Sequence, residues 1–356
     1  IGVEHVLQLP PEQLKKMASA LKLHAGFKTS SRKPEKVIEE YIEHVKDNLM
    51  WLHNLVAEQY PDLIERSHQW YDGARRITTE WAKIYGVPDR SVAAVLAALS
   101  PQMDWFKNVT LAQRVLDIHT HLTTGNAVAM PPLDSMKAWA DAKYAPRKKP
   151  ANWDKKSAKR KAEWERDERN NALKLAQYRE LFAGDKTYSD LPEGQNGDIE
   201  RAMWLRAYDE AENPRTYRLV TPEGAFGDLA TNNDGTPARA TWGTFREIAK
   251  AISAVRDPSV EGISAFIGGE HKVRNFYNNI LTPNSPFGEV TIDTHAVAAA
   301  LMLPLGGSDL EVAQNFGGGG APSSNVTGSQ GIYGILAEAY RRAAADPGID
   351  RLPRQI

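Results

Sequence analysis

The segment that decides the fold is ISAFIGGEHKVRNFYNNILTPNSPFGEVTIDTHAVAAALMLPL, residues 263–305. Its residue pattern predicts helices over 263–269, 272–280 and 294–303. Two glycines separate the first two helices, and an irregular loop with two prolines precedes the third. Asp293 stands directly before this third helix. The segment therefore predicts a pair of helices joined by a glycine turn, then a loop that carries a carboxylate to a helix N-terminus.

The glycine turn is a candidate phosphate-binding element. Gly268 and Gly269 have no side chains, so backbone amides at the N-terminus of the next helix could approach a phosphate closely. The dipole of that helix would attract the anion. Lys272 and Arg274 add positive charge at the same place.

Apolar residues at helical spacing continue through most of the chain. Between Pro34 and Val56 they recur at steps of three and four residues, which places them on one face of a long helix. An alanine-rich helix over 91–99 should be deeply buried. Similar patterns predict helices over 11–24, 61–85, 108–119, 173–182, 242–252 and 332–345. The chain is therefore predicted to be mainly α.

Two short motifs next to these helices carry their own expectations. Gly86-Val87-Pro88-Asp89 ends the helix over 61–85, and we expect Asp89 to be the N-cap of the helix that follows. His119 and His121 are two residues apart, which is not a spacing that places both on one helical face. We expect both histidines to lie at the surface.

Residues 216–242 differ in character from the helical segments around them. Turn-forming residues occur at Pro222-Glu223-Gly224 and at Asp234-Gly235, with short potential strands between them. This pattern predicts a β-hairpin or a small meander inserted into a helical protein.

The composition excludes several classes of function. The chain of 356 residues has no cysteine, which excludes disulfides, thiolate zinc sites, iron–sulfur clusters and a cysteine nucleophile. No apolar run approaches the roughly 18–20 residues that a membrane-spanning helix needs, and the first residues do not resemble a secretory signal. We expect a cytoplasmic protein (in the host cytoplasm if it is phage-encoded) with no membrane partner, no metal and no cofactor.

The charge is unevenly distributed. The chain has a net charge of −1, but residues 143–174 contain 12 Lys/Arg against 5 Asp/Glu, a local net charge of +7. A basic segment on an otherwise acidic chain would concentrate attraction for phosphates on one face. The alternative is a solvated charged helix or a mobile arm.

The segment 263–305 resembles the helix-hairpin-helix DNA glycosylase superfamily, which has the fold of endonuclease III. In that family a glycine turn grips the DNA backbone, a lysine opens the second helix of the hairpin, and a short apolar run ends in Asp-Thr-His before another helix. Gly268, Lys272 and Ile292-Asp293-Thr294-His295 stand in that order here. The resemblance implies a two-lobed helical fold, with DNA as the partner and Asp293 and Lys272 as the catalytic residues.

An earlier segment adds to the resemblance. Ala97-Ala98-Leu99-Ser100-Pro101-Gln102 looks like the buried alanine-rich helix of the family that ends in Leu-Ser-x-Gln. The glutamine of that motif approaches the gap left by a flipped base, a role that would fall to Gln102. The match covers roughly residues 92–102 and 263–305, with a terminal helix, and leaves the rest of the chain unexplained.

The chain also departs from the family pattern. The usual hairpin sequence is Pro-Gly-Val-Gly, whereas this chain has Ile267-Gly268-Gly269-Glu270, with an acidic residue in place of the second glycine. This substitution weakens the case for a phosphate grip. The segment from Ser100 to Trp105 and Asn108 looks closer to phage-type relatives. One branch of glycosylase-fold proteins comprises pyrophosphorylases and amino acid:DNA transferases that hypermodify thymine, and the chain resembles that branch as well.

Asp293 has a physical role that does not depend on the resemblance. Cleavage of an N-glycosidic bond builds positive charge on the sugar, and a nearby carboxylate stabilises it and orients the nucleophile. Apolar neighbours would desolvate the carboxylate and strengthen its field. The alternative is that Asp293 only caps its helix, and the two roles are compatible.

Lys272 is a candidate nucleophile. Its amine could attack C1′ and form a Schiff base, which would give lyase activity, if burial or a neighbouring cation lowers its pKa. The alternative is a lysine that contacts phosphate or solvent.

Other residues are candidates for contact with DNA or with a flipped base, although packing or hydrogen bonding within the protein is the simpler explanation for most of them. They are Ser100, Gln102, Trp105, Asn108, Gly268, Gly269, His271, Arg274, Tyr277 and His295.

These observations leave three functional hypotheses. The first is a DNA glycosylase, with or without lyase activity, that acts on a modified or damaged base. The second is a phage DNA hypermodification transferase that acts on modified thymine, and the third is a DNA-binding protein without catalysis. The expected segments are an N-terminal helical region (1–90), the first part of a glycosylase-like core (91–142), a basic insertion with the hairpin (143–241), the helix-hairpin-helix and catalytic Asp region (242–345) and a tail (346–356).

Overall fold

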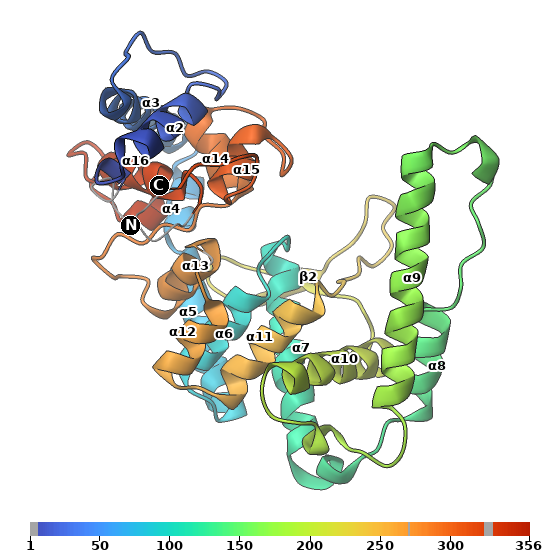
Figure 1. Cartoon of the computed structure of the whole chain (residues 1–356). Coiled ribbons are helices and arrows are strands. Elements are labelled where there is room, and N and C mark those ends of the chain that lie inside the picture. The colour runs from blue at the N-terminus through green and yellow to red at the C-terminus, as the bar shows by residue number, and fades with distance from the viewer. Residues whose placement is uncertain (1–5, 270, 324–329) are drawn as a thin grey trace. The chain divides into compact units, whose positions relative to one another are not determined.

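The computed structural model describes residues 6–269, 271–323 and 330–356 (Figure 1). They form mainly helices and one two-stranded antiparallel sheet, which confirms the prediction of a mainly α protein with a small β-hairpin. The chain divides into two compact units, which share helix α5 (Trp70–Tyr85). Unit 1 takes its residues from Ile1–Thr79, Thr221–Ala225 and Ile267–Ile356, and unit 2 from Glu80–Val220 and Phe226–Phe266.

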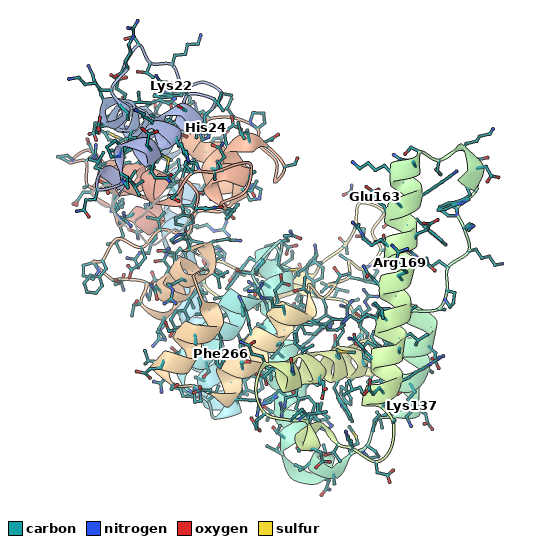
Figure 2. The ribbon with its side chains drawn as sticks, viewed as in Figure 1. Lys22, His24, Lys137, Glu163, Arg169 and Phe266 are labelled. Atoms are coloured by element: carbon teal, nitrogen blue, oxygen red, sulfur yellow. The ribbon has the colours of Figure 1, made fainter. Side chains whose placement is uncertain are left out.

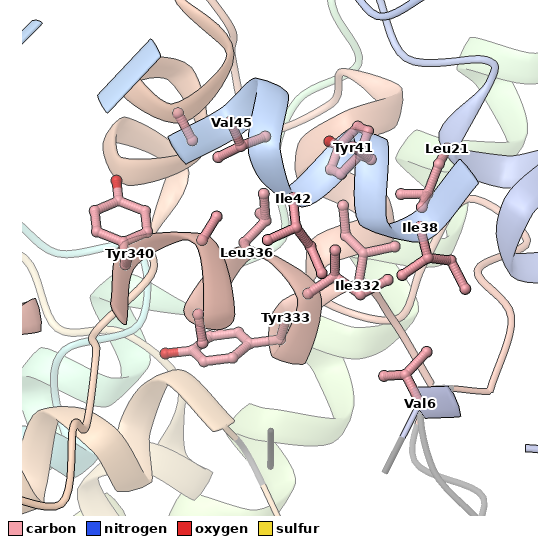
Figure 3. Packing of buried hydrophobic residues seen from close by; sticks show 14 of the residues in the cluster. Val6, Leu21, Ile38, Tyr41, Ile42, Val45, Ile332, Tyr333, Leu336 and Tyr340 are labelled. Carbon is pink, nitrogen blue, oxygen red and sulfur yellow. The ribbon is translucent and has the colours of Figure 1, made fainter. Parts of the chain in front are cut away.

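Unit 1 is built around α3 and α16. Besides the first part of α5, its helices are α2 (Pro11–Leu21), α3 (Pro34–Gln59), α4 (Pro61–His68), α13 (His271–Leu281), α14 (Thr294–Leu301), α15 (Leu310–Asn315), α16 (Tyr333–Ala344) and the 3-10 helix η4 (Pro353–Gln355). Figure 3 shows Ile42 and Val45 of α3 beside Leu336 of α16 in the buried core. This packing confirms the predicted apolar face of the helix that begins at Pro34.

Several predicted helix boundaries were wrong. The helix predicted over 173–182 begins much earlier, as α9 (Ala158–Leu181). The helix predicted over 61–85 is two helices, because α4 ends at His68 and α5 begins at Trp70. Asp89 is not the N-cap of the helix that follows. Pro88 holds that position in an extended conformation, and Asp89 lies in the first turn, where its charge interacts favourably with the helix dipole.

The close approach of two backbone segments inside unit 1 explains why position 73 is a glycine. A Cβ atom at Gly73 would lie 1.9 Å from the carbonyl oxygen of Pro222, a distance that no real contact allows. The turn over Thr221–Ala225 therefore packs directly on the backbone of α5. Gly224 in the same turn has a φ of +88°, which side-chain-bearing residues rarely adopt.

Unit 2 contains the central helices and the sheet. Besides the end of α5, its elements are α6 (Asp89–Ala98), α7 (Trp105–Thr123), η1 (Gly125–Ala129), α8 (Asp134–Lys143), η2 (Trp153–Lys155), α9 (Ala158–Leu181), η3 (Tyr188–Asp190), α10 (Gln195–Glu212), β1 (Arg218–Val220), β2 (Phe226–Leu229), α11 (Phe245–Arg256) and α12 (Val260–Ile267), whose last residue belongs to unit 1. Every residue of α6 from Ser91 to Ala98 is buried, as its alanine-rich sequence predicted.

The β-hairpin lies where the turn residues predicted it. Strands β1 and β2 pair antiparallel, with Arg218 opposite Leu229 and Val220 opposite Phe226. An isolated bridge between Thr216 and Arg239 extends the pairing beyond the named strands.

The expectation for His119 was wrong. Helix α7 continues to Thr123, so His119 lies within the helix rather than at its end, and its side chain is buried. Its Nδ1 atom forms a 2.8 Å hydrogen bond with the hydroxyl of Tyr188. His121 is exposed, as predicted.

Candidate functional site

The turn before α13 is closed by its own arginine. Gly268 has a φ of +66°, and its carbonyl oxygen accepts hydrogen bonds from Nε and Nη2 of Arg274, over 3.1 and 2.8 Å. The guanidinium therefore stabilises the turn in which it was expected to meet a phosphate. Gly269 is exposed, and a Cβ added there would meet nothing within 4 Å. Glu270, the departure from the family pattern, lies outside the described residues.

Asp293 lies at the N-terminus of α14. Its Oδ1 atom accepts a hydrogen bond from the amide of Ala296 over 2.9 Å, so the carboxylate is the N-cap of the helix. The preceding residues Val290 and Ile292 are buried, while Asp293 itself is partly exposed. The capping interaction uses one oxygen, and in the described part of the chain no hydrogen bond engages Oδ2.

Lys272 lies close enough to Asp293 for the two charges to interact. Burial lowers the pKa of the Lys272 amine, and the negative charge of Asp293 acts in the opposite direction. Both side chains are partly exposed. The charges of the two residues that the sequence analysis named as catalytic therefore interact, although among the described residues their side chains form no ion pair or hydrogen bond with each other.

The charge of Asp293 acts on three tyrosines. Burial raises the pKa values of Tyr71, Tyr333 and Tyr340, and the charge of Asp293 raises each of them further. Tyr333 and Tyr340 come from α16, and Tyr71 comes from α5. The carboxylate is thus close enough to these three phenols for its charge to affect their pKa values, and charges interact more strongly in a partly buried environment than in water.

A polar cluster beside Asp293 was not predicted. The side chain of Asn279 is completely buried, and its Nδ2 atom donates to Oγ1 of Thr291 over 3.0 Å. Both side chains also act on the Tyr71 hydroxyl, whose pKa burial raises and Thr291 and Asn279 lower. Oδ1 of Asn279 is buried without a partner among the described residues. The helical spacing could have identified Asn279, because it lies seven residues after Lys272 and so on the same face of α13.

Aromatic rings extend this cluster. The imidazole of His271 stacks on the ring of Tyr333 at a centroid distance of 5.3 Å and an interplanar angle of 25°. Phe276 packs near Trp70 and Tyr71, at centroid distances of 5.8 and 6.3 Å. Burial lowers the pKa of His271, and the nearby Arg274 contributes in the same direction.

Two further predicted residues in unit 1 differ in exposure. Tyr277 lies on α13 and is partly exposed. His295 is exposed on the first turn of α14.

The remaining predicted contacts belong to unit 2. Ser100 is buried and donates to the carbonyl of Ala97 over 2.9 Å. Asn108 is also buried, and its Nδ2 atom donates to the carbonyl of Leu96 over 3.0 Å. Both side chains therefore bind carbonyl groups at the end of α6. Gln102 is exposed with a φ of +55°, and Trp105 is the first residue of α7 and partly exposed.

Two cavities formed by described residues of unit 2 contain no residue of the Lys272–Asp293 cluster. The larger, of about 760 Å³, lies between one face of α7 and the hairpin, with Gln113, Asp117 and Phe226 among its lining residues. The smaller, of about 540 Å³, lies beside α9.

Among the described residues there is no group of three or more histidine, aspartate and glutamate side chains arranged to hold a metal ion. Their helices also include none with the length and apolar character needed to cross a bilayer.

One comparison with known proteins gives a match. Residues 34–159 are similar to a family of unknown function, DUF7178. The matched region includes Tyr71 and the segment from Ser100 to Asn108, and it ends before Lys272 and Asp293. No curated protein and no solved structure matches the chain.

Proposed function

We propose that this chain is a DNA base-processing enzyme, a DNA glycosylase that acts on a modified or damaged base flipped out of DNA. The observation that carries the proposal is the interaction of Lys272 with Asp293. Burial lowers the pKa of the Lys272 amine, and the Asp293 carboxylate acts on the charge of that amine. This combination suits a reaction at a sugar carbon, because it supplies a nucleophile and a fixed negative charge together.

The chemistry assigned to Asp293 is electrostatic. As the bond between C1′ and the base breaks, the bonding electrons leave with the base, which takes up a proton, and positive charge develops on the sugar. The carboxylate stabilises that charge. Its position among Tyr71, Tyr333 and Tyr340 supports this role, because buried rings lower the local dielectric.

The chemistry assigned to Lys272 is nucleophilic. In its neutral form the amine attacks C1′ as the base departs, and loss of a proton and opening of the sugar ring then give an imine between Nζ and C1′. The imine acidifies the proton on C2′, and loss of that proton with departure of the 3′ phosphate breaks the strand, which gives lyase activity in addition to base release. A lowered pKa supports the role, since it increases the neutral fraction of the amine at a given pH.

Incubation with DNAs that carry different modified pyrimidines, followed by mass spectrometry of bases and nucleosides, tests the proposal. A free base and an abasic site are the expected products. A gain of mass on the base in an intact strand would replace the glycosylase with a hypermodification transferase. Retained DNA binding with neither product would leave a non-catalytic DNA-binding protein.

A further inference from the structure

The positive charge of residues 143–174 is concentrated at one place in unit 2. Residues 147–161 contain eight Lys/Arg and one Asp, a net charge of +7, whereas residues 162–174 have a net charge of −1. We call residues 147–161 the basic tip. It comprises the chain between α8 and α9, with η2 inside it, and the first turn of α9.

The basic tip is held together by specific contacts. The rings of Trp153 and Trp164 pack edge to face at a centroid distance of 4.9 Å. The amide of Arg147 donates to the carboxylate of Glu168 over 3.0 Å, and the guanidinium pairs with the same carboxylate. Lys161 donates to the carbonyl of Asp154 over 3.2 Å. These contacts fix the chain before α9 along one side of the helix. The cations of this chain and those of the first turn of α9 therefore form one surface.

Helix α9 has little contact with the rest of unit 2. Of its 24 residues only Tyr178 and Leu181 are buried, and both lie at its C-terminal end. Its N-terminal half stands apart from the other helices of its unit in Figure 1. Figure 2 shows the side chains of Glu163 and Arg169 along this exposed length. The basic tip is therefore accessible over both the loop and the helix.

Four exposed cations of the basic tip have no partner within the part of the chain that the structure describes. Lys148, Lys155, Lys159 and Arg160 are exposed and form neither a hydrogen bond nor an ion pair through their side chains. The first turn of α9 contains no acidic residue, so cations stand where the helix dipole already gives positive potential. Like charges gathered in this way repel one another, and a bound polyanion would relieve the repulsion.

We propose that the basic tip binds the phosphate backbone of double-stranded DNA. A lipid surface fits less well. Membrane binding by a helix needs an apolar face, and the nearby rings of Trp153 and Trp164 pack on each other instead of forming one. An acidic protein partner would require exposed apolar anchors at the centre of the interface. The basic tip instead offers charge without such anchors, which is typical of contacts to phosphates.

The choice of DNA as the source of the phosphates rests on the proposed function, but the binding itself does not involve Lys272 or Asp293. The basic tip lies in unit 2, and those two residues lie in unit 1. Binding at the basic tip can therefore be measured without any chemical turnover.

The test compares two variants of the full chain with the same change in charge. The first carries Lys148→Gln, Lys155→Gln, Lys159→Gln and Arg160→Gln. The control carries Lys16→Gln, Lys28→Gln, Arg32→Gln and Lys33→Gln, which removes four exposed cations of unit 1. Fluorescence anisotropy with a random-sequence DNA duplex gives Kd as a function of salt concentration.

For the basic-tip variant we expect Kd to rise at least about tenfold at moderate salt. The slope of log Kd against log salt should fall by up to about 3.6, since each of the four lost phosphate contacts contributes about 0.9. The control should change neither quantity by a comparable amount. Equal Kd values and slopes for the two variants would overturn the inference. So would tighter binding of the unsubstituted chain to poly-glutamate or to phosphatidylserine-containing vesicles than to the duplex.

The outcomes separate this inference from the proposed function. A chain that binds DNA through the basic tip but releases no base supports the inference and contradicts the proposed function. A chain that releases base while the basic-tip variant binds DNA normally supports the proposed function and overturns the inference.

Discussion

The hydroxyl of Tyr333 donates a hydrogen bond to the carbonyl of Val290 over 2.7 Å. The same hydroxyl accepts a hydrogen bond from the amide of Ile292 over 2.9 Å. Both partners belong to the extended segment that leads into Asp293, and Tyr333 belongs to α16 in the core of unit 1. One phenol therefore fixes the backbone next to the candidate catalytic carboxylate.

The variant Tyr333→Phe tests this positioning role. It leaves a buried amide and a buried carbonyl without partners, so we expect the free energy of unfolding to fall by about 2 kcal/mol. Base release by the folded protein should fall as well, mainly in kcat, because Asp293 is no longer held in place. The control Tyr188→Phe removes the hydroxyl that bonds His119 in unit 2, and it should lower stability without changing kcat. Equal kcat values for the two variants would show that Tyr333 only stabilises the fold.

Substitution of Asp293 separates its capping role from its proposed catalytic role. Asparagine is as good an N-cap as aspartate, so Asp293→Asn should keep the stability of the chain and its affinity for DNA while abolishing base release. Asp293→Ala should also lose about 1 kcal/mol of stability, because the amide of Ala296 loses its acceptor. Chemical denaturation and product analysis measure the two effects. Full base release by Asp293→Asn would leave Asp293 with the capping role alone.

The pH dependence of covalent trapping tests the Lys272 amine. Burial lowers its pKa from the ordinary 10.5, so the neutral amine is available at lower pH than for an exposed lysine. The assay uses DNA that already contains an abasic site, so that imine formation does not require base release. Reduction of the imine with borohydride should trap this DNA on the chain with a midpoint below pH 10.5, and Lys272→Met should trap none. Asp293→Asn should move the midpoint further down, because the carboxylate raises this pKa. An unchanged midpoint in Asp293→Asn would show that the two groups do not interact.

Local patterns predicted most of the helices and the hairpin. The apolar face of α3 and the buried alanine-rich α6 followed from periodicity, and the hairpin followed from turn residues. The N-cap of α6 was misplaced by one residue, because Pro88 takes the extended cap conformation that was expected of Asp89. Such boundaries depend on the backbone conformation of single residues, which apolar spacing does not determine.

The candidate site was predictable only in part. Lys272 and Asp293 could be named because they lie in one short segment of the chain. Tyr71 lies more than 200 residues earlier, and only the folded chain brings its hydroxyl to Asn279 and Thr291. His119 was misjudged for the same reason, since its burial depends on Tyr188, 69 residues further along the chain.

His119 makes the fold sensitive to acid. Burial lowers its pKa from the ordinary 6.5 to about 4, and the positive charges of Arg256 and Arg201 contribute in the same direction. Between these two values the unfolded chain binds a proton that the folded chain does not. The free energy of unfolding should therefore fall as the pH falls from about 6.5 towards 4, by on the order of 3 kcal/mol in total.

Denaturant unfolding at several pH values measures this loss and assigns it to one residue. His119→Gln replaces the titrating ring with a side chain that stays neutral, so its stability should vary less with pH across this interval than that of the unsubstituted chain. The exposed His121, two residues further along α7, provides the control, and His121→Gln should keep the acid sensitivity. If His119→Gln lost stability towards pH 4 as steeply as the unsubstituted chain, the acid sensitivity would belong to other groups. A shallower profile in His119→Gln alone would mean that the buried contact with Tyr188 requires a neutral imidazole.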